Sequence, residues 1–383
     1  MNFSQETFNL EKCSNQKSKA KYDKIKNHIL KCIKNNSFGF ISDLYSKNYN
    51  EIFSTVNKLK KFDNVLFLGT GGSSLGGKTI VSLVNNYFLN NTKPKIYFIE
   101  NVDSSSILGL LKNIKLNRTA CVVTSKSGET IETISQFFLI LNQFEKKKIS
   151  IKKKFFIITE DKESSLKDIQ EEKNLFFLNH PKSIGGRFSV FSIVGLLPAS
   201  LVNFNIKKFC DGAKDFLREI KYSKKFDYFF YPIFNLIKLN EKGVNMSIMM
   251  PYSDSLNNLS LWYRQLWAES TGKKGKGITP INSLGTVDQH SQLQLYLDGP
   301  RDKFFTIIGE KKTKKSVKIN CIYSKNKIYE NLHNKSLDTL LEAEMMSTIE
   351  TIKNKNLPTR VLILKSLKEK DMGSLMMFFF IET

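Results

Sequence analysis

The apolar residues of the chain fall into short continuous runs that alternate with segments of helical periodicity. From residue 64 onward, the runs are NVLFL, IYFIE, ACVVT, KFFIITE and LFFLN, at residues 64–68, 96–100, 120–124, 154–160 and 175–179. Between them, the spacing predicts helices in GGKTIVSLVNNYFL, from Ser104 to about Ile114, after Thr130, and in SSLKDIQEEK. Short apolar strands separated by helices are typical of parallel βαβ units whose sheet is covered on both faces.

The same pattern restarts after residue 204. Strands are predicted in NMSIMMPY, KFFTIIGE, VKINCIY and RVLILKSL, at residues 245–252, 303–310, 317–323 and 360–367. The most apolar window, residues 188–204, is shorter than the ~20 residues of a membrane span and contains Pro198, so a buried helix is expected there. We therefore predict two doubly wound parallel-sheet domains of three-layer α/β/α type, residues 1–186 and 187–383.

Composition narrows the class of protein. The chain has 383 residues, of which 41% are apolar, so it can bury substantial cores and is not globally disordered. Its five cysteines are scattered and form no CxxC pair, which favours a reducing compartment and argues against a cysteine zinc site. The polar N-terminal stretch lacks an apolar signal core, so we expect a soluble cytoplasmic protein that is not bound to a membrane.

The formal net charge of +23 raises the possibility of nucleic-acid binding. The lysines are spread along the whole length, however, and aromatic residues alternate with apolar residues instead of basic ones. Nucleic-acid binding is therefore the weaker interpretation, and no nucleic-acid partner is expected. The positive charge would still attract an anionic substrate.

The turn after residue 124 combines hydroxyls, a lysine and a glycine in SKSGET. Here a strand ends and a helix begins, so unpaired backbone N–H groups face the loop. Ser125, Ser127 and Thr130 add hydroxyls, Gly128 permits close approach and Lys126 adds charge, which together suit a phosphate. An ordinary helix cap would need only one hydroxyl. No GxxxxGK[ST] motif is present, so a nucleoside triphosphate is not indicated.

Two further glycine-containing turns are candidates. LGTGGSSLGGKT, residues 68–79, is either a tight βα turn or a backbone contact to a sugar through Gly72 and Ser73, and its match to dinucleotide-binding motifs is weak. In SIGGRFSVFSIVG, Arg187 precedes an apolar segment, where a charge is costly without a partner. That partner is either a structural carboxylate or negative charge on a substrate.

Two titratable residues are candidates for proton transfer. Glu269, in WYRQLWAESTGK, shares a helix face with Trp262, and partial desolvation there would make it a general base; the alternative is a solvated surface carboxylate. His290 stands beside Asp288 and Gln289 in a polar turn, where it can exchange protons near neutral pH, although a lone histidine is often structural. No HxxxH or HExxH spacing indicates a metal.

Taken together and in this order, the blocks GTGGSSLG, SKSGETIET, GGRFSVFS, ESTGK and GTVDQHSQLQLYLDGP resemble the glucose-6-phosphate isomerase (phosphoglucose isomerase) family. The resemblance implies two sugar-isomerase (SIS) domains and a homodimer that needs neither metal nor cofactor. It also implies interconversion of glucose 6-phosphate and fructose 6-phosphate through an enediolate, in glycolysis and gluconeogenesis.

The resemblance also implies roles for individual residues. Glu269 would move the proton between C2 and C1, Arg187 would stabilise the enediolate, and His290 would open the sugar ring from the neighbouring subunit. The remaining residues would bind substrate: Ser125, Lys126, Ser127 and Thr130 the phosphate, and Gly72 and Ser73 the sugar.

One departure concerns the end of the sequence. The family carries a further block with an active-site Gln and Lys beyond the position of MGSLMMFFFIET, where this sequence ends without a helix cap. A truncated chain is therefore expected. Two alternatives stay open: a sugar-phosphate-binding protein without catalysis, and an isomerase that also accepts mannose 6-phosphate.

Overall fold

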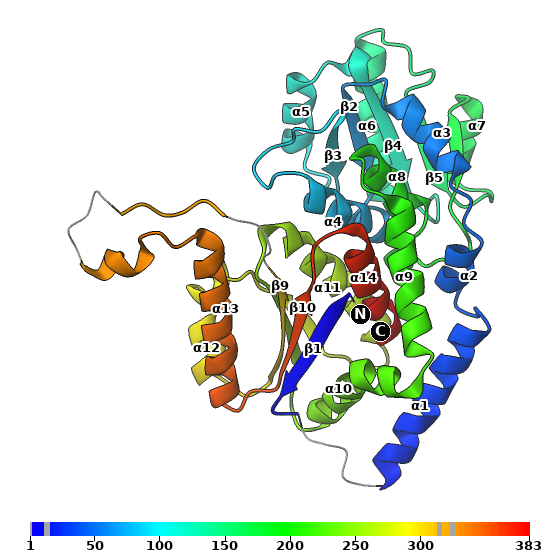
Figure 1. Cartoon of the computed structure of the whole chain (residues 1–383). Helices are drawn as coiled ribbons and strands as arrows, with labels where there is room; N and C mark the ends of the chain where they lie inside the picture. Colours follow the sequence, from blue (N-terminus) through cyan, green and yellow to red (C-terminus); the bar gives the residue numbers. More distant parts are fainter. Residues whose placement is uncertain (1, 11–15, 312–315, 322–326) are drawn as a thin grey trace.

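A computed structural model describes the whole chain except residues 1, 11–15, 312–315 and 322–326. It contains two five-stranded sheets, one in each of two lobes (Figure 1). Both sheets carry helices on each face, so the predicted doubly wound α/β class is confirmed. Within the described residues, no helix has both the length and the apolar character needed to span a membrane.

The first sheet is parallel throughout and occupies the upper lobe in Figure 1. In sheet order its strands are β3 (Lys95–Ile99), β2 (Asn64–Leu68), β4 (Thr119–Thr124), β5 (Phe155–Thr159) and β6 (Phe176–Asn179). The helices that accompany it are α3 (Asn50–Leu59), α4 (Leu75–Val84), α5 (Ser104–Asn113), α6 (Ile131–Lys146) and α7 (Ser165–Glu172).

Alternate residues of each strand serve two different cores. Val65 and Phe67 of β2 face the core shared with α3, α4 and α8 (Ile193–Leu201), whereas Leu66 and Leu68 face the core shared with α5 and α6. Burial of both faces explains why these strands are continuous apolar runs without polar alternation. All five strand predictions in this lobe are correct to within one residue at either end.

The second sheet combines four parallel strands with one antiparallel edge strand. In sheet order its strands are β1 (Phe3–Phe8), β10 (Thr359–Leu364), β9 (Lys303–Glu310), β7 (Met246–Pro251) and β8 (Thr279–Asn282). The associated helices are α1 (Gln16–Lys34), α2 (Gly39–Tyr45), α9 (Ile206–Ile220), α10 (Ser223–Glu241), α11 (Asn257–Thr271), α12 (Leu293–Asp298), α13 (Leu337–Asn354) and α14 (Glu369–Glu382).

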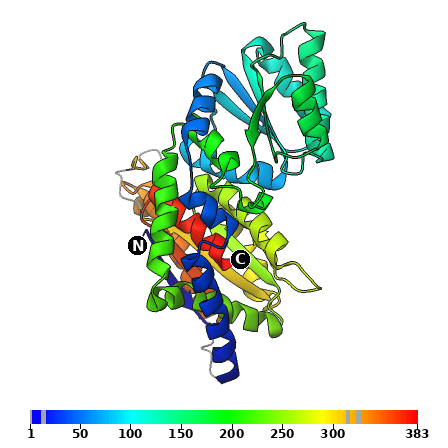
Figure 2. The same ribbon diagram turned by 90° about the vertical axis from the view of Figure 1, so that its right-hand side faces the viewer.

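The N-terminal segment belongs to the second sheet, which the sequence did not indicate. Strand β1 pairs antiparallel with β10, and Tyr22 of α1 packs on Tyr231 and Phe234 of α10. Figure 2 shows the N-terminus and α1 beside the lower lobe. The division of the chain at residue 186 stays a prediction. All strands before residue 186 belong to the first sheet except β1, and all strands after it belong to the second sheet.

Three local predictions differ from the structure. Residues 317–321 form no strand: only Lys318 makes an isolated bridge, to Ser336, and residues 322–323 lie outside the described residues. The helix expected over 188–204 is shorter, because η3 (Gly186–Phe188) and a turn precede α8. Ser192 is the N-cap of α8, and its hydroxyl accepts a hydrogen bond from the Val194 N–H. Strand β8 was not predicted, since its four residues carry no apolar run.

Candidate active site

Two loops that follow neighbouring strands lie in contact at the carboxyl edge of the first sheet. The loop after β2 begins at Gly69 and the loop after β4 begins at Ser125, and β2 and β4 are paired directly. A Cβ atom placed on Gly69 would lie 2.8 Å from the Thr124 carbonyl oxygen and 2.9 Å from Cβ of Ser73. In a parallel sheet this edge is the usual ligand site, as the sequence motifs predicted.

The hydroxyls of the loop after β4 are gathered by hydrogen bonds. The Ser125 Oγ lies 2.8 Å from Oγ1 of Thr130 and 3.4 Å from Oγ of Ser127. Thr130 occupies the N-cap position of α6, yet its side chain caps no backbone N–H of that helix. Thr130 is therefore not a helix cap, although Ser125 and Ser127 accept from the Gly128 and Glu129 N–H groups of the loop, and the three hydroxyls converge at the positive end of a 16-residue helix.

Gly128 fixes the path of this loop. Its φ is +77°, in the left-handed region, and a Cβ atom there would overlap the Ser164 hydroxyl that precedes α7. The next residue, Glu129, accepts hydrogen bonds of 2.7 Å from both the backbone N–H and the hydroxyl of Ser165. The loop is thus attached to α7 and held in one conformation.

The Lys126 ammonium is directed to one side of the loop. Its Nζ donates to the Lys182 carbonyl oxygen at 3.2 Å and lies 3.4 Å from Oε1 of Glu160. Burial opposes ionisation of Glu160, but hydrogen bonds from Lys162 and Lys126 bring its pKa below the usual value. Glu160 is therefore a carboxylate at neutral pH and offsets part of the Lys126 charge.

The glycine turn after β2 packs against the turn that carries Arg187. A Cβ atom on Gly72 would overlap the Gly186 carbonyl group, and Ser189 Oγ donates to the Gly72 carbonyl oxygen at 2.7 Å. Only glycine permits this approach of two backbones. The contact places Arg187 beside Gly72 and Ser73 although more than a hundred residues separate them.

Helix α11 completes the cluster with its last turn. Arg187 Nε donates to Ser270 Oγ at 2.8 Å, and its Nη1 lies 3.6 Å from Oε2 of Glu269. The Glu269 side chain is 50% exposed, so burial by its own chain is only partial. The structure therefore brings together an arginine and a carboxylate beside the glycine turn, with the carboxylate open toward solvent.

Gln265 is a site residue whose role sequence reasoning missed. Its Nε2 donates to Glu269 Oε1 at 2.8 Å, and a Cβ atom on Gly71 would lie 2.7 Å from the same nitrogen. Its Oε1 is buried and has no hydrogen-bond partner among the residues that the structure describes. The spacing of four residues before Glu269 could have indicated this contact, since residues i and i+4 meet on a helix.

In its own chain, His290 forms no hydrogen bond or ion pair with this cluster within the described residues. It follows η5 (Val287–Gln289), its side chain is exposed, and its ring makes no hydrogen bond within the described part of the chain. Asp288 fixes the turn by accepting from the Leu284 N–H at 2.6 Å and Ser291 Oγ at 2.5 Å. Burial opposes the ionisation of Asp288, but these bonds keep its pKa below the usual value.

Comparison with known proteins decides the family. The family model described as phosphoglucose isomerase matches residues 47–380. The chain belongs to the phosphoglucose isomerase family. A probable glucose-6-phosphate isomerase of Methanococcus maripaludis is 36% identical over 91% of this chain and 78% of its own length.

Solved structures agree with the phosphoglucose isomerase fold. A hypothetical protein from Thermus thermophilus superposes with a TM-score of 0.83 at 25% identity, over 94% of this chain and 87% of that one. A glucose-6-phosphate isomerase from Chlamydia trachomatis gives a TM-score of 0.72 at 23% identity, over 90% and 68% of the two chains, and supports the fold alone. The family expectation made from the motif blocks is confirmed.

The arrangement combines groups suited to anion binding with groups suited to proton transfer. The hydroxyls lie together at the start of α6, and Arg187 lies beside the half-exposed carboxylate of Glu269. Within the described residues, no group of three or more His, Cys, Asp or Glu side chains is placed to hold a metal ion. The chemistry that these side chains offer is acid–base chemistry on an anionic ligand.

Proposed function

We propose that this chain interconverts glucose 6-phosphate and fructose 6-phosphate as an aldose–ketose isomerase of glycolysis and gluconeogenesis, acting in the cytoplasm. The observation that carries the proposal is the contact of Arg187 with Glu269 beside the glycine turn, at 3.6 Å. A base and a fixed positive charge at that separation suit a reaction in which removing a proton creates an oxyanion. Membership of the phosphoglucose isomerase family supports the same reaction.

The substrate phosphate is bound at the start of α6. Hydroxyls of Ser125, Ser127 and Thr130 donate to the phosphate oxygens, together with the uncapped backbone N–H groups of the first helical turn. Lys126 adds positive charge, of which Glu160 offsets a part. Anchoring one end of the substrate lets the open-chain sugar extend along Gly72 and Ser73 toward Glu269.

Glu269 then transfers one proton between neighbouring carbons. Its carboxylate removes the proton from C2 of the aldose, the freed electron pair forms the C1–C2 double bond, the carbonyl pair moves onto the C1 oxygen, and an enediolate forms. The protonated Glu269 returns the proton to C1, while the proton of the C2 hydroxyl passes to the C1 oxygen, which leaves a ketone at C2 and a hydroxyl at C1. Arg187 stabilises the negative oxygens of the intermediate, and Gln265 holds the carboxylate through its hydrogen bond of 2.8 Å.

Ring opening requires a proton carrier at the far end of the substrate. In its own chain His290 is exposed and makes no hydrogen bond to the described residues, which supports its delivery to the site of a second subunit. Exposed apolar side chains lie near it: Val287 is 61% and Phe88 is 83% exposed, and both line one surface pocket. Covering this patch in a homodimer would remove that apolar area from water.

The reaction is tested with the purified chain and fructose 6-phosphate, by coupling glucose 6-phosphate formation to a dehydrogenase. We expect turnover that needs no added metal. Saturable binding of fructose 6-phosphate without turnover would instead identify the chain as a sugar-phosphate-binding protein. Running mannose 6-phosphate alongside decides whether the C2 epimer is also accepted.

Mixing two inactive variants tests whether His290 acts across the dimer. We expect Glu269→Gln and His290→Leu to be inactive alone but to recover about a quarter of wild-type activity after equimolar unfolding and refolding together. Half of the random dimers are then mixed, and each mixed dimer has one intact site. The measurement is initial rate against mixing ratio. No recovery, with mixed dimers shown by a tag pull-down, would place His290 in the site of its own chain.

A further inference from the structure

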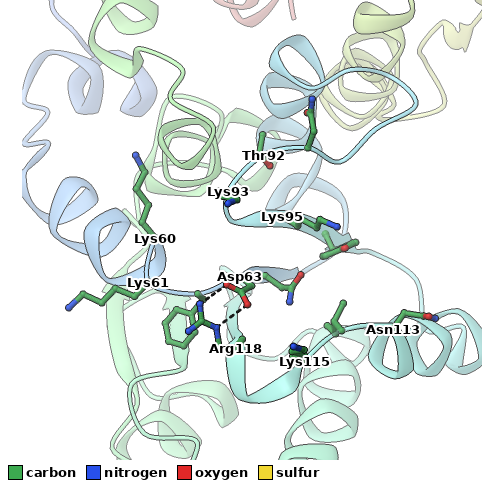
Figure 3. A pocket seen from close by; sticks show the side chains of 14 residues that line it. Lys60, Lys61, Asp63, Thr92, Lys93, Lys95, Asn113, Lys115 and Arg118 are labelled. Atoms are coloured by element: carbon green, nitrogen blue, oxygen red, sulfur yellow. Dashed lines mark hydrogen bonds and ion pairs between the residues drawn. The ribbon is translucent and has the colours of Figure 1, made fainter.

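A second basic cavity lies at the opposite edge of the first sheet (Figure 3). Its volume is about 670 Å³, within the range of small-molecule sites. The lining includes Asn64, the first residue of β2. The catalytic loop begins at Gly69, directly after Leu68, the last residue of the same strand. Five residues of extended strand separate the two edges by about 16 Å, so this cavity is distinct from the substrate site.

The charge of the lining is strongly one-sided. It contains five lysines and one arginine but a single acid, Asp63. Arg118 forms a bidentate pair with Asp63: its Nε donates to Oδ2 at 2.9 Å and its Nη2 donates to Oδ1 at 2.7 Å. The pair is mutually neutralised, so the lysines are left as uncompensated charge.

Three of those lysines are not in contact with a carboxylate. In the described part of the chain, no carboxylate forms an ion pair with Lys93, Lys95 or Lys115, and the Asp63 charge acts on Lys93 and Lys115 only from a longer distance. Lys60 differs, since its Nζ donates to the side-chain oxygen of Asn203 at 2.8 Å. Figure 3 shows Lys93, Lys95 and Lys115 placed around the Asp63–Arg118 pair.

Helix ends do not account for this charge. Helices α3 and α5 both end at this edge, after Leu59 and Asn113, and lysines near helix C-termini stabilise the partial negative charge there. Each helix end is equivalent to roughly half an elementary charge, so two ends offset about one lysine. The remaining lysines exceed what the helices require.

The backbone beneath the lysines is rigid. The Lys95 N–H donates to the Asp63 carbonyl oxygen and the Asp63 N–H to the Arg118 carbonyl oxygen, both at 2.8 Å. Lys95 begins β3 and Lys115 lies four residues before β4, so lysines enter the cavity from both strands beside β2, whose backbones lie about 10 Å apart at two strand spacings. A chain of two or three linked phosphates can contact lysines from both sides at once.

We propose that this cavity binds a small polyanion that carries two or three linked phosphate groups. Lysine ammonium groups are compact point charges that attract phosphate from several directions and need no planar partner. The charged residues of the lining outnumber its apolar residues Phe62, Tyr97 and Ile114, which favours a ligand held by its charge. The site is separate from catalysis and is filled independently of the isomerase substrate.

The test is isothermal titration of the purified protein at physiological ionic strength with fructose 6-phosphate saturating the catalytic loops. We expect tripolyphosphate to bind with a dissociation constant at least about tenfold below that of orthophosphate. In the triple variant Lys93→Gln, Lys95→Gln, Lys115→Gln, the dissociation constant for tripolyphosphate should rise at least about tenfold, and kcat should be unchanged. The matched control Lys221→Gln, Lys224→Gln, Lys225→Gln removes the same charge from exposed lysines of the other lobe and should bind normally.

Several outcomes separate this site from general charge attraction. The proposal is overturned if both triple variants lose the same amount of affinity for tripolyphosphate, or if the wild-type protein shows no saturable binding of tripolyphosphate. Tighter binding of a single-stranded oligonucleotide, lost in the same pocket variant, overturns it in favour of a nucleic-acid surface. Parallel titrations with ADP and pyrophosphate identify the kind of ligand. Tighter binding of ADP indicates a nucleotide, and equal binding of both indicates that only the phosphate chain is recognised. Either result upholds the site.

Discussion

Replacing Glu269 with glutamine is expected to lower kcat for fructose 6-phosphate by about 10²- to 10⁴-fold, the range that a positioned acid–base group contributes. Glutamine keeps the size of the side chain and still reaches Gln265, which bonds the native carboxylate at 2.8 Å. It cannot accept the proton that the native carboxylate removes from C1 of fructose 6-phosphate. Because Ser125, Ser127 and Thr130 are unchanged, KM should stay within a few-fold of the wild-type value.

Steady-state kinetics with the coupled assay measure both constants. The matched control is Glu172→Gln, whose side chain is 73% exposed at the end of α7, and it should keep wild-type kcat and KM. Exchange of a C1 hydrogen of fructose 6-phosphate with deuterium from solvent gives a second readout, since it requires the same proton removal. Retention of full activity and of exchange in Glu269→Gln would transfer the role of base to another group.

The alternation of strands and helices was readable from the sequence because the first sheet is buried on both faces. Continuous apolar runs such as those of β2 and β4 arise directly from that burial. Strand β1 lacks this signal: its burial alternates along FSQETF, as expected for an edge strand with one solvated face. Its pairing with β10 spans nearly the whole chain, so no local pattern could indicate it.

The strand predicted over 317–323 shows the reverse error. Its alternating apolar and polar residues fit a strand, yet the described residues 317–321 make only one isolated bridge, and Val317 is 87% exposed. Alternation of apolar and polar residues indicates only that a segment could pair at the edge of a sheet. Whether a neighbouring strand is available there depends on the whole topology.

The candidate site was predictable as a set of residues but not as a geometry. Hydroxyls, glycines and charges at the carboxyl ends of β2 and β4 identified its components, since parallel strands bring their ends to one edge. Sequence did not reveal that Lys126 turns toward Glu160, or that Gln265 bridges Gly71 and Glu269. Those contacts depend on side-chain directions set by packing between segments far apart in the chain.

The second large effect is expected at a buried ion pair beneath α11. The side chains of Arg360 of β10 and Glu382 of α14 are 1% and 0% exposed, and Nη1 of Arg360 lies 2.7 Å from Oε2 of Glu382. The Tyr263 hydroxyl donates to the other carboxylate oxygen, at 2.7 Å. Replacing Glu382 with leucine leaves the guanidinium buried and unpaired, so we expect a loss of about 3–5 kcal/mol in the free energy of unfolding.

Urea unfolding followed by tryptophan fluorescence measures this loss, because the only two tryptophans, Trp262 and Trp267, are buried on α11 next to Tyr263. The double variant Arg360→Met, Glu382→Leu removes both charges and should be more stable than Glu382→Leu alone. The control Glu350→Leu disrupts an exposed pair with Lys353 and should cost less than about 1 kcal/mol. If Glu382→Leu costs no more than that control, the buried charges are solvated in the folded protein and the pair does not hold α14 to β10.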